Sequence, residues 1–435
     1  MTSFSDFTCT ACGCVCDDLR LVVRNGTIES VDCHGCPIAD AWFHRIIAAQ
    51  SSPPAIATIN DQPADLESAL DRAASILSNS RSPLIYGLSR SSTPGQRAAV
   101  ELADRIGAIV DTTASVCHGP SIMAIQSVGE STSTLGEVKE RADLVIFWGA
   151  DPLTTHPRHL ERYSGTPRSQ FLPHGRQDRT IVVVDRQQTS TAAAADVVVQ
   201  VPPGRDFELI NALRMTIQGA TKTGPSAAQH HQTPLADELA EQVSVLAKLM
   251  LGCRYGVVFF GLGIAQQPLG HLTVEALLRL VADLNAVTRF TARRLRIPGD
   301  VSGADAVLCW QTGFPFAVSL QRESPRYCPG EFSITDVLRR GDVDSCVVVG
   351  SESLRDVPVD AQARLAELPT IVLDHAHQPS TCRADVRFTT SVYGLHAVGT
   401  AYRMDEVPIA LRSYVSSNYP ADHEVLAQLL NRVSV

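Results

Sequence analysis

The sequence predicts an α/β protein with two doubly wound parallel sheets, preceded by a small cysteine-rich β segment. Short runs of Val, Ile and Leu alternate with alanine-rich amphipathic stretches over most of the 435 residues. This alternation is typical of parallel strands that are buried on both faces. The runs are too numerous for one open sheet, so two are expected. The predicted strands are residues 83–87, 108–111, 143–148, 180–184, 255–260, 306–309, 345–349 and 370–373.

The stretches between the strands read as helices and loops. Residues 64–79 and 94–106 have helical patterns, and residues 19–29 read as two short strands around the Asn25-Gly26 turn. The polar region 219–234 is predicted to be a surface loop. No internal repeat of fixed period is apparent.

Composition excludes several classes of protein. The formal net charge of −9 argues against a nucleic-acid groove, because phosphates require a basic face. No apolar run is long enough to span a bilayer, so no membrane contact is expected. The N-terminus lacks the basic start and apolar stretch of an export signal. We therefore expect a cytoplasmic protein whose twelve cysteines stay reduced, which favours metal ligation over disulfides.

Four cysteines near the start of the chain follow the spacing C-x₂-C-x₃-C-x₁₉-C: Cys9, Cys12, Cys16 and Cys36. Three thiolates on one turn and a fourth shortly after are typical of a [4Fe–4S] cluster. Two further cysteines, Cys14 and Cys33, lie in the same segment. A structural zinc site built from any four of the six is the alternative.

Small and polar residues follow three of the predicted strands. Ligands of open α/β sheets bind beyond the carboxyl ends of the strands. Gly and Asp after a strand are most often turn residues, but together these segments are candidates to hold an extended nucleotide-bearing cofactor. The candidates are Gly149, Asp151, Pro152 and His156 after the first strand, Asp185 and Thr189 after the second, and Gly261 and Gly263 after the third.

The segment 116–121 contains a Cys-His pair, Cys117-His118, followed by Gly119-Pro120. It reads either as a buried cysteine with a capping histidine, or as a thiolate on a bend where His118 lowers its pKa or handles protons. A cysteine protease is disfavoured, because such a nucleophile does not need an iron–sulfur site upstream.

These motifs resemble the B subunit of formylmethanofuran dehydrogenase, in the molybdopterin oxidoreductase superfamily, which is similar to the molybdenum formate dehydrogenases. The resemblance covers essentially the whole chain in order. It is carried by the opening cysteines and by segments 116–121, 149–159, 259–264, 325–331 and 399–404. It implies an iron–sulfur segment at 1–50, a discontinuous α/β domain at 51–135 with 326–435, and a second at 136–325, without the C-terminal β-barrel domain of free-standing formate dehydrogenases.

The resemblance also implies roles for individual residues. Cys9, Cys12, Cys16 and Cys36 fall on the cluster ligands. Cys117 falls on the ligand of tungsten or molybdenum, His118 on the histidine that moves a proton, and Arg296 on the arginine that positions formate or CO₂. A guanidinium fork suits a planar carboxylate. The strand-end residues given above fall on the bis(pterin guanine dinucleotide) site. In the family, CO₂ is reduced to formate with electrons from the cluster, and a separate amidohydrolase-type subunit joins formate to a furan carrier.

Four departures from the family pattern concern the cofactors. Asp185 is followed by Arg186 rather than proline, Pro37 replaces a basic residue, Pro298 interrupts a glycine-polar stretch, and Val398 replaces an acidic residue. They suggest an alternative: a non-redox scaffold subunit of a bacterial formyltransferase/hydrolase complex in C1 metabolism. Both alternatives imply partner subunits of amidohydrolase and formyltransferase type, and one that closes the pterin site.

Overall fold

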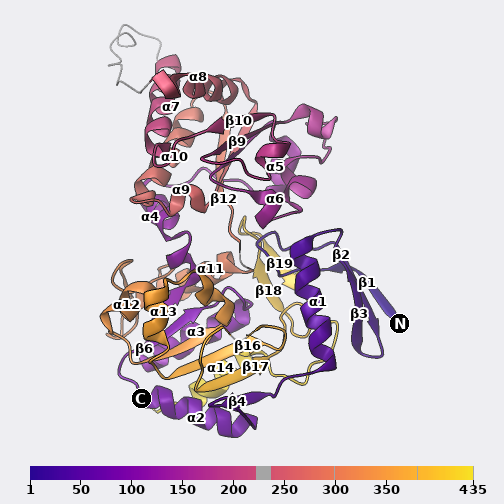
Figure 1. Cartoon of the computed structure of the whole chain (residues 1–435), viewed down its shortest axis with the longest axis vertical. Helices are drawn as coiled ribbons and strands as arrows, with labels where there is room; N and C mark the ends of the chain where they lie inside the picture. Colours follow the sequence, from indigo (N-terminus) through magenta and orange to yellow (C-terminus); the bar gives the residue numbers. More distant parts are fainter. Residues whose placement is uncertain (222–236, 298, 380, 435) are drawn as a thin grey trace. The chain divides into compact units, whose positions relative to one another are not determined.

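The computed structural model describes residues 1–221, 237–297, 299–379 and 381–434 (Figure 1). The chain forms two compact units. Unit 1 comprises Met1–Val116 and Ile297–Val435, and unit 2 comprises Cys117–Arg296. Each unit is built on a sheet whose central strands are parallel, so the predicted mixed α/β class is confirmed.

Unit 1 begins with a three-stranded antiparallel sheet and a helix. The strands are β1 (Thr2–Phe7), β2 (Leu19–Arg24) and β3 (Thr27–Asp32), and helix α1 (Pro37–Ser51) follows. The predicted turn is confirmed: Asn25 and Gly26 have φ of 51° and 80°, as a tight hairpin turn requires. Pro37 stands at the start of α1, where its missing N–H leaves no helical bond unmade.

The main sheet of unit 1 has nine strands in the order β14-β13-β7-β6-β15-β16-β17-β4-β5. Its parallel centre consists of β7 (Ile109–Thr112), β6 (Pro83–Gly87), β15 (Ser345–Val349), β16 (Thr370–His375) and β17 (Val386–Thr390). Antiparallel strands flank it: β13 (Val318–Ser319), β14 (Arg326–Tyr327), β4 (Ala57–Ile59) and β5 (Gln62–Ala64).

The helices of unit 1 bury the apolar faces of this sheet. Helix α3 (Thr93–Ile106) packs against α14 (Asp422–Arg432) and α11 (Val301–Thr312), and α14 also contacts α2 (Leu66–Ser78). Helices α12 (Ile334–Arg340) and α13 (Val359–Leu365) contact each other. A separate hairpin pairs β18 (Gly399–Tyr402) with β19 (Pro408–Leu411).

Unit 2 is a five-stranded parallel sheet in the order β10-β9-β8-β11-β12. Its strands are β8 (Leu144–Trp148), β9 (Thr180–Asp185), β10 (Val197–Gln200), β11 (Tyr255–Phe260) and β12 (Arg289–Arg294). The strand order reverses between β8 and β11, which is where open α/β sheets bind ligands.

The larger helices of unit 2 pack around one another beside this sheet. They are α4 (Gly119–Val128), α7 (Asp206–Thr221), α8 (Asp237–Gly252) and α10 (Gly270–Leu284). Figure 1 shows α5 (Leu135–Arg141) on the other side of the sheet from α7 and α10. Two four-residue helices, α6 (Pro152–Thr155) and α9 (Leu262–Ala265), follow β8 and β11 directly.

One predicted strand is wrong, and the unit boundaries differ from the predicted ones. Residues 306–309 lie inside helix α11, because apolar residues at helical spacing (Val301, Ala304, Val307 and Leu308) face the core. The chain changes unit at Val116–Cys117 and Arg296–Ile297, since α4 packs on α10 in unit 2 and α11 packs on α3 in unit 1. Most of the predicted loop 219–234 lies outside the described residues; 219–221 belong to α7.

Asp300 holds the start of α11. Its Oδ1 accepts the backbone N–H of Gly303 at 3.0 Å and of Tyr402 at 2.7 Å, and its Oδ2 accepts from Gln96 Nε2 at 3.1 Å. Burial disfavours the carboxylate and raises the pKa of Asp300 to about 7, although the three hydrogen bonds oppose the rise. The folded state therefore binds a proton more tightly than the unfolded state.

This raised pKa predicts a pH-dependent stability. Asp300 contributes stability below pH of about 4, and the contribution is lost as pH rises towards 7, with a slope of about 1.4 kcal/mol per pH unit. Asp300→Asn keeps the oxygen that accepts both N–H groups but cannot ionise. We expect thermal unfolding of the purified protein at pH 5 and pH 7 to differ less in this variant than in the wild type. An equal difference in both proteins would contradict the assignment.

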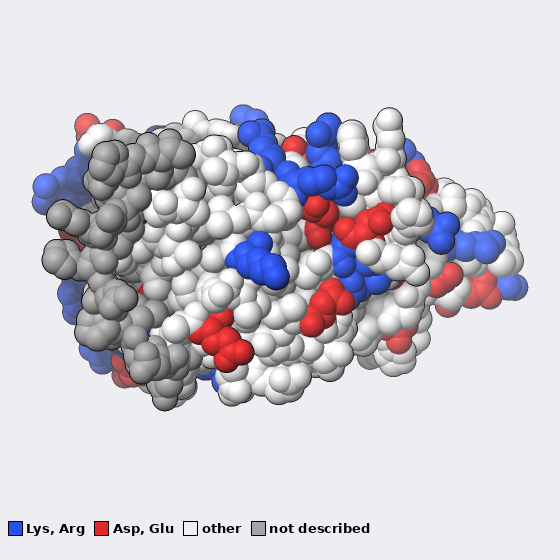
Figure 2. All heavy atoms as spheres, turned by 90° about the horizontal axis from the view of Figure 1, so that it is seen from above, with Lys and Arg blue, Asp and Glu red and all other residues white. Residues whose placement is uncertain are grey.

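Charged side chains of both signs are intermixed on the described surface. On the face in Figure 2, most of the described surface is uncharged, and basic and acidic side chains form small groups beside one another. That face carries no continuous basic stripe of the kind that binds nucleic acid. Among the described residues, no helix is both long and apolar enough to cross a bilayer.

Candidate functional site

The N-terminal cysteines lie on a closed loop in unit 1. The Cys9 N–H donates to the Cys16 carbonyl at 2.7 Å, and the Val15 N–H donates to the Cys12 carbonyl at 3.2 Å. Val15 closes the turn with a φ of 41°, a left-handed conformation unusual for a β-branched residue. Every cysteine in this segment, including Cys36, is buried. The loop therefore gathers thiols away from water.

Neighbouring thiols and backbone amides shift the pKa values of the cysteine thiols in the loop. Burial raises the pKa of the Cys9 thiol, and Cys12, Cys16 and Cys36 raise it further, while the Ala11 N–H lowers it by donating to Cys9. Burial also raises the pKa of Cys36, which lies at the N-terminus of α1, where the Ala39 and Ile38 backbone N–H groups act to lower it. The four thiols are electrostatic neighbours, and backbone amides near Cys9 and Cys36 oppose the rise of their pKa values.

The two remaining cysteines of the segment act as hydrogen-bond donors. Hydrogen bonds to Cys12 and Cys16, together with burial, raise the pKa of Cys14 and keep it protonated. Cys33 Sγ donates to the Val31 carbonyl at 3.8 Å. In the described part of the chain, no three His, Cys, Asp or Glu side chains converge as they would on a single metal ion. A four-iron cluster takes one thiolate at each iron, so its ligands surround a volume instead.

The candidate catalytic residues meet at the carboxyl edge of the unit 2 sheet. The Leu295 N–H donates to the Phe260 carbonyl at the end of β11. Nε2 of His118 lies 3.2 Å from the Leu295 carbonyl, and Nε2 of His156 lies 2.8 Å from the Arg296 carbonyl. Two histidines from separate loops thus hold consecutive carbonyls. They bring Cys117-His118 and Arg296, all buried, to one place.

His118 is neutral in this setting. Burial lowers its pKa to about 3, and the Arg296 and Arg294 guanidiniums add to this effect. The Leu295 carbonyl can only accept, so the ring carries its proton on Nε2. Nδ1 then accepts from the Ser121 hydroxyl at 3.3 Å. Both ring nitrogens are engaged in hydrogen bonds.

The three predicted cofactor glycines pack against each other. A Cβ on Gly263 would lie 2.7 Å from Gly149 Cα, and one on Gly261 would lie 2.5 Å from the Gly149 carbonyl oxygen. The Gly261 N–H donates to the Trp148 carbonyl and the Gly263 N–H to the Gly149 carbonyl, both at 3.1 Å. These amides are therefore used within the protein, and the glycines let the loops after β8 and β11 touch.

The polar strand-end residues also serve the loops. Asp151 Oδ1 accepts the Thr191 N–H at 2.9 Å and Oδ2 accepts from the Thr154 hydroxyl at 2.7 Å. Partial burial acts to raise the pKa of Asp151, but these bonds outweigh it and lower the pKa. Pro152 starts α6.

In the loop after β9, Asp185 Oδ1 accepts the Gln187 N–H and Thr189 Oγ1 accepts the Ala192 N–H, both at 3.1 Å. Both side chains are half-buried at the strand end. Of the polar candidates, these two lie in the loop where the sequence departs from the family pattern.

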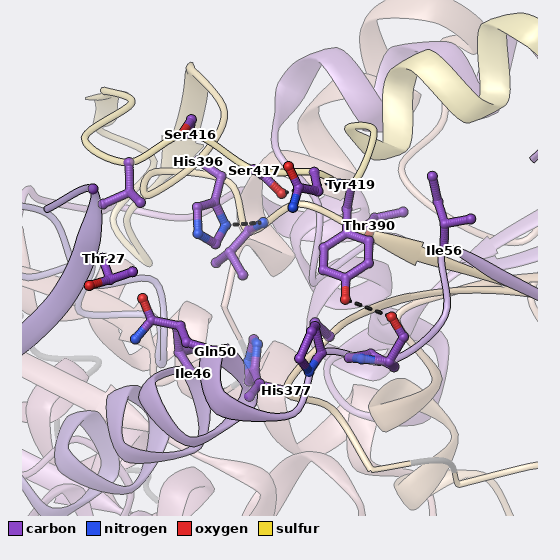
Figure 3. A pocket seen from close by; sticks show the side chains of 18 residues that line it. Thr27, Ile46, Gln50, Ile56, His377, Thr390, His396, Ser416, Ser417 and Tyr419 are labelled. Carbon is purple, nitrogen blue, oxygen red and sulfur yellow. Dashed lines mark hydrogen bonds between the residues drawn. The ribbon is translucent and has the colours of Figure 1, made fainter.

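A pocket of about 440 Å³ opens elsewhere in unit 1 (Figure 3). It lies between α1, the ends of β16 and β17, and residues 415–419, and both His377 and His396 line it. Burial lowers the pKa of His377 to about 2 and of His396 to about 4, so the pocket wall is uncharged at neutral pH. His377 also meets the Trp42 ring edge-on at 4.5 Å.

Sequence reasoning missed one buried cation beside the cysteine loop. Arg90 follows β6 and contacts the loop directly. The only signal was the polar run Ser89-Arg90-Ser91 after a predicted strand.

Comparisons with known proteins agree with this fold. No family model matches the chain. It is 37% identical to the B subunit of tungsten-containing formylmethanofuran dehydrogenase 2 from Methanocaldococcus jannaschii, over 98% of this chain and 97% of that protein. Identity to the protein of the same name from Methanococcus maripaludis is 36%, over 100% and 99%. Identity to the B subunit of the formyltransferase/hydrolase complex Fhc from Methylorubrum extorquens is 26%, over 85% and 94%.

A solved structure has the same fold. It is the formyltransferase/hydrolase complex FhcABCD of Methylorubrum extorquens with methylofuran, with a TM-score of 0.68 and 23% identity over 86% of this chain and 98% of that one. The fold and the similarity over most of the chain define an α/β subunit of the kind found in formylmethanofuran dehydrogenase and formyltransferase/hydrolase complexes. Within that class, the chain belongs to the family of formylmethanofuran dehydrogenase B subunits.

Proposed function

We propose that this chain is the B subunit of a formylmethanofuran dehydrogenase-type complex that interconverts CO₂ and formate. The observation that carries the proposal is the meeting of Cys117-His118 with Arg296 at the carboxyl edge of the unit 2 sheet, held by the His118 contact to Leu295 at 3.2 Å. Full-length identity of 37% to a tungsten-containing relative supports the same assignment.

Cys9, Cys12, Cys16 and Cys36 are the ligands we assign to a [4Fe–4S] cluster. The fit rests on their burial, their mutual effect on pKa and the backbone amides near Cys9 and Cys36. Backbone N–H groups of this kind stabilise thiolates in a buried site. Cys14, whose thiol interacts with Cys12 and Cys16 and stays protonated, fits a supporting role.

Cys117 is the ligand we assign to tungsten or molybdenum held by a bis(pterin guanine dinucleotide). When bound, this group supplies the electron pair that, with one proton, converts CO₂ to formate. Asp185 and Thr189, in the loop after β9, are the residues we assign to the nucleotide. Gly149, Gly261 and Gly263 shape the sheet edge rather than donate to phosphates, because their contacts are with each other.

Arg296 and His118 are assigned to substrate and proton. The Arg296 guanidinium binds the planar carboxylate of formate through paired N–H groups. His118 exchanges a proton at Nδ1, the nitrogen that faces the Ser121 hydroxyl, since Nε2–H is used on the Leu295 carbonyl. His156 keeps Arg296 in place through the Arg296 carbonyl.

Elemental analysis of the natively purified complex tests the proposal. We expect about one tungsten or molybdenum and at least about four irons per chain, as one bis-pterin centre and one cubane require. The partners expected in the complex are the amidohydrolase-type, formyltransferase-type and pterin-site-closing subunits. Iron without either heavier metal, or none of the three, would overturn the redox assignment. That result would favour a scaffold subunit of a formyltransferase/hydrolase complex.

A further inference from the structure

Arg90 is a buried arginine fixed at both ends of its guanidinium. Its Nη1 donates to the carbonyls of Thr10 and Ala11, at 3.1 and 3.0 Å. Its Nη2 and Nε donate to the Glu352 carboxylate, at 2.8 and 3.2 Å. Arg90 is 7% exposed, and the Trp42 ring lies 4.7 Å from the guanidinium carbon. A single side chain therefore fixes the backbone between the first two cysteines of the loop by hydrogen bonds.

The surrounding backbone is adapted to place Arg90. Gly87 and Leu88 at the end of β6 have φ of 110° and 71°, and leucine rarely adopts the second value. A Cβ on Gly350 would lie 2.7 Å from Arg90 Cβ, so only glycine admits the side chain there. Such strained and close-packed positions are kept where geometry matters.

Because Arg90 fixes two backbone carbonyls by hydrogen bonds, it also fixes the direction of the N–H group that follows each carbonyl. In a planar trans peptide the C=O and the following N–H point in opposite directions. With the Thr10 and Ala11 carbonyls turned towards Arg90, the N–H groups of Ala11 and Cys12 face away from it. The Ala11 N–H does donate to the Cys9 sulfur. Arg90 thus aims amide donors at the sulfur side of the loop.

We propose that Arg90 is a positioning residue for the iron–sulfur cluster, which sets the cluster's reduction potential by aiming the Ala11 and Cys12 amides at its sulfurs. The inference rests on the proposed function, because it needs the cluster to be bound by these cysteines. Amide hydrogen bonds to the sulfurs and nearby positive charge both favour the reduced, more negative cluster. Arg90 supplies the two together, and Glu352 partly offsets its charge.

Geometry and charge can be separated by substitution. Arg90→Gln removes the positive charge and the paired hydrogen bonds to the two loop carbonyls. Arg90→Lys keeps the charge, but an ammonium lacks the planar fork that reaches two carbonyls and a carboxylate. Glu352→Gln keeps the Arg90 hydrogen bonds to the loop carbonyls and removes the negative charge that offsets Arg90. Arg179→Gln is the matched control, because Arg179 is also buried and donates to the Pro167, Gly175 and Lys139 carbonyls, but in unit 2.

The test is a redox titration of the cluster signal by electron paramagnetic resonance, with iron counted in each purified complex. We expect a more negative midpoint potential for Arg90→Gln, a smaller shift in the same direction for Arg90→Lys, and a less negative potential for Glu352→Gln. Arg179→Gln should match the wild type. Loss of Arg90 should also weaken cluster retention by about 10- to 100-fold, the range for a group that supports metal ligands.

These variants distinguish a wrong role for Arg90 from a wrong assignment of the cluster. If the wild type holds its cluster and Arg90→Gln leaves both potential and iron unchanged, the role of Arg90 is wrong while the proposed function stands. If Arg90→Gln fails to assemble, the other variants still test the role of Arg90. Equal shifts of the midpoint potential in Glu352→Gln and Arg179→Gln would overturn it. A more negative potential in Arg90→Lys together with a less negative potential in Glu352→Gln would support it. A wild-type complex without iron would overturn both.

Discussion

Cys117→Ser is expected to abolish formate-dependent dye reduction by the assembled complex, a loss on the order of 10³-fold or more, as when an enzyme loses a group on which its chemistry depends. A serine hydroxyl stays protonated at neutral pH, so it does not supply the anionic sulfur ligand that the Cys117 thiolate would supply. The readout is viologen reduction with formate, together with tungsten, molybdenum and iron per chain. Iron should persist, because the cluster cysteines are untouched.

Cys253→Ser is the matched control for this variant. Cys253 is half-buried, and its Sγ donates to the Met250 carbonyl at 3.2 Å, a bond that a hydroxyl can make as well. The control should retain wild-type activity and metal content. Unchanged formate oxidation in assembled Cys117→Ser would remove Cys117 from the metal site. Absence of activity in the wild type would point to the scaffold alternative.

Much of the fold follows from local pattern. The strands of the two parallel sheets are readable because buried strands require continuous Val and Ile runs, as in Ser345–Val349 and Thr180–Asp185. The run 306–309 is easily misread, because a short apolar run has no period that separates strand from helix. The feature that decides for helix, the cap at Asp300, is completed by Tyr402, which is about a hundred positions away.

The position of the site can be predicted from the sequence, but the roles of its individual residues are harder to predict. Strand-end residues gather at one edge because parallel strands end there, and His156 and Arg296 do meet. That Gly149 and Gly263 face each other depends on which loops cross, which no local pattern contains. Arg90 escapes prediction for the same reason, since its carbonyl partners are 79 and 80 positions away.

Gly263→Ala is expected to destabilise unit 2 by about 3 kcal/mol, the upper end of the usual range for overpacking, because the neighbour is rigid. The added Cβ would lie 2.7 Å from Gly149 Cα and 2.8 Å from its carbonyl oxygen, and backbone atoms cannot rotate away. The corresponding fall in Tm is on the order of 10 °C. Thermal unfolding of protein prepared without tungsten or molybdenum is the measurement.

Gly252→Ala is the control, because it adds the same methyl group at a glycine where there is room for it. A Cβ there meets no atom within 4 Å, at the end of helix α8, so alanine should be neutral or stabilising by up to about 1 kcal/mol. The two explanations of the glycines then diverge. If Gly263 exists for loop packing, its alanine variant loses stability even without cofactor. If Gly263 exists only to let a cofactor approach, the cofactor-free variant should unfold like the wild type and lose heavy metal alone, because only bound phosphate would then meet the new methyl group.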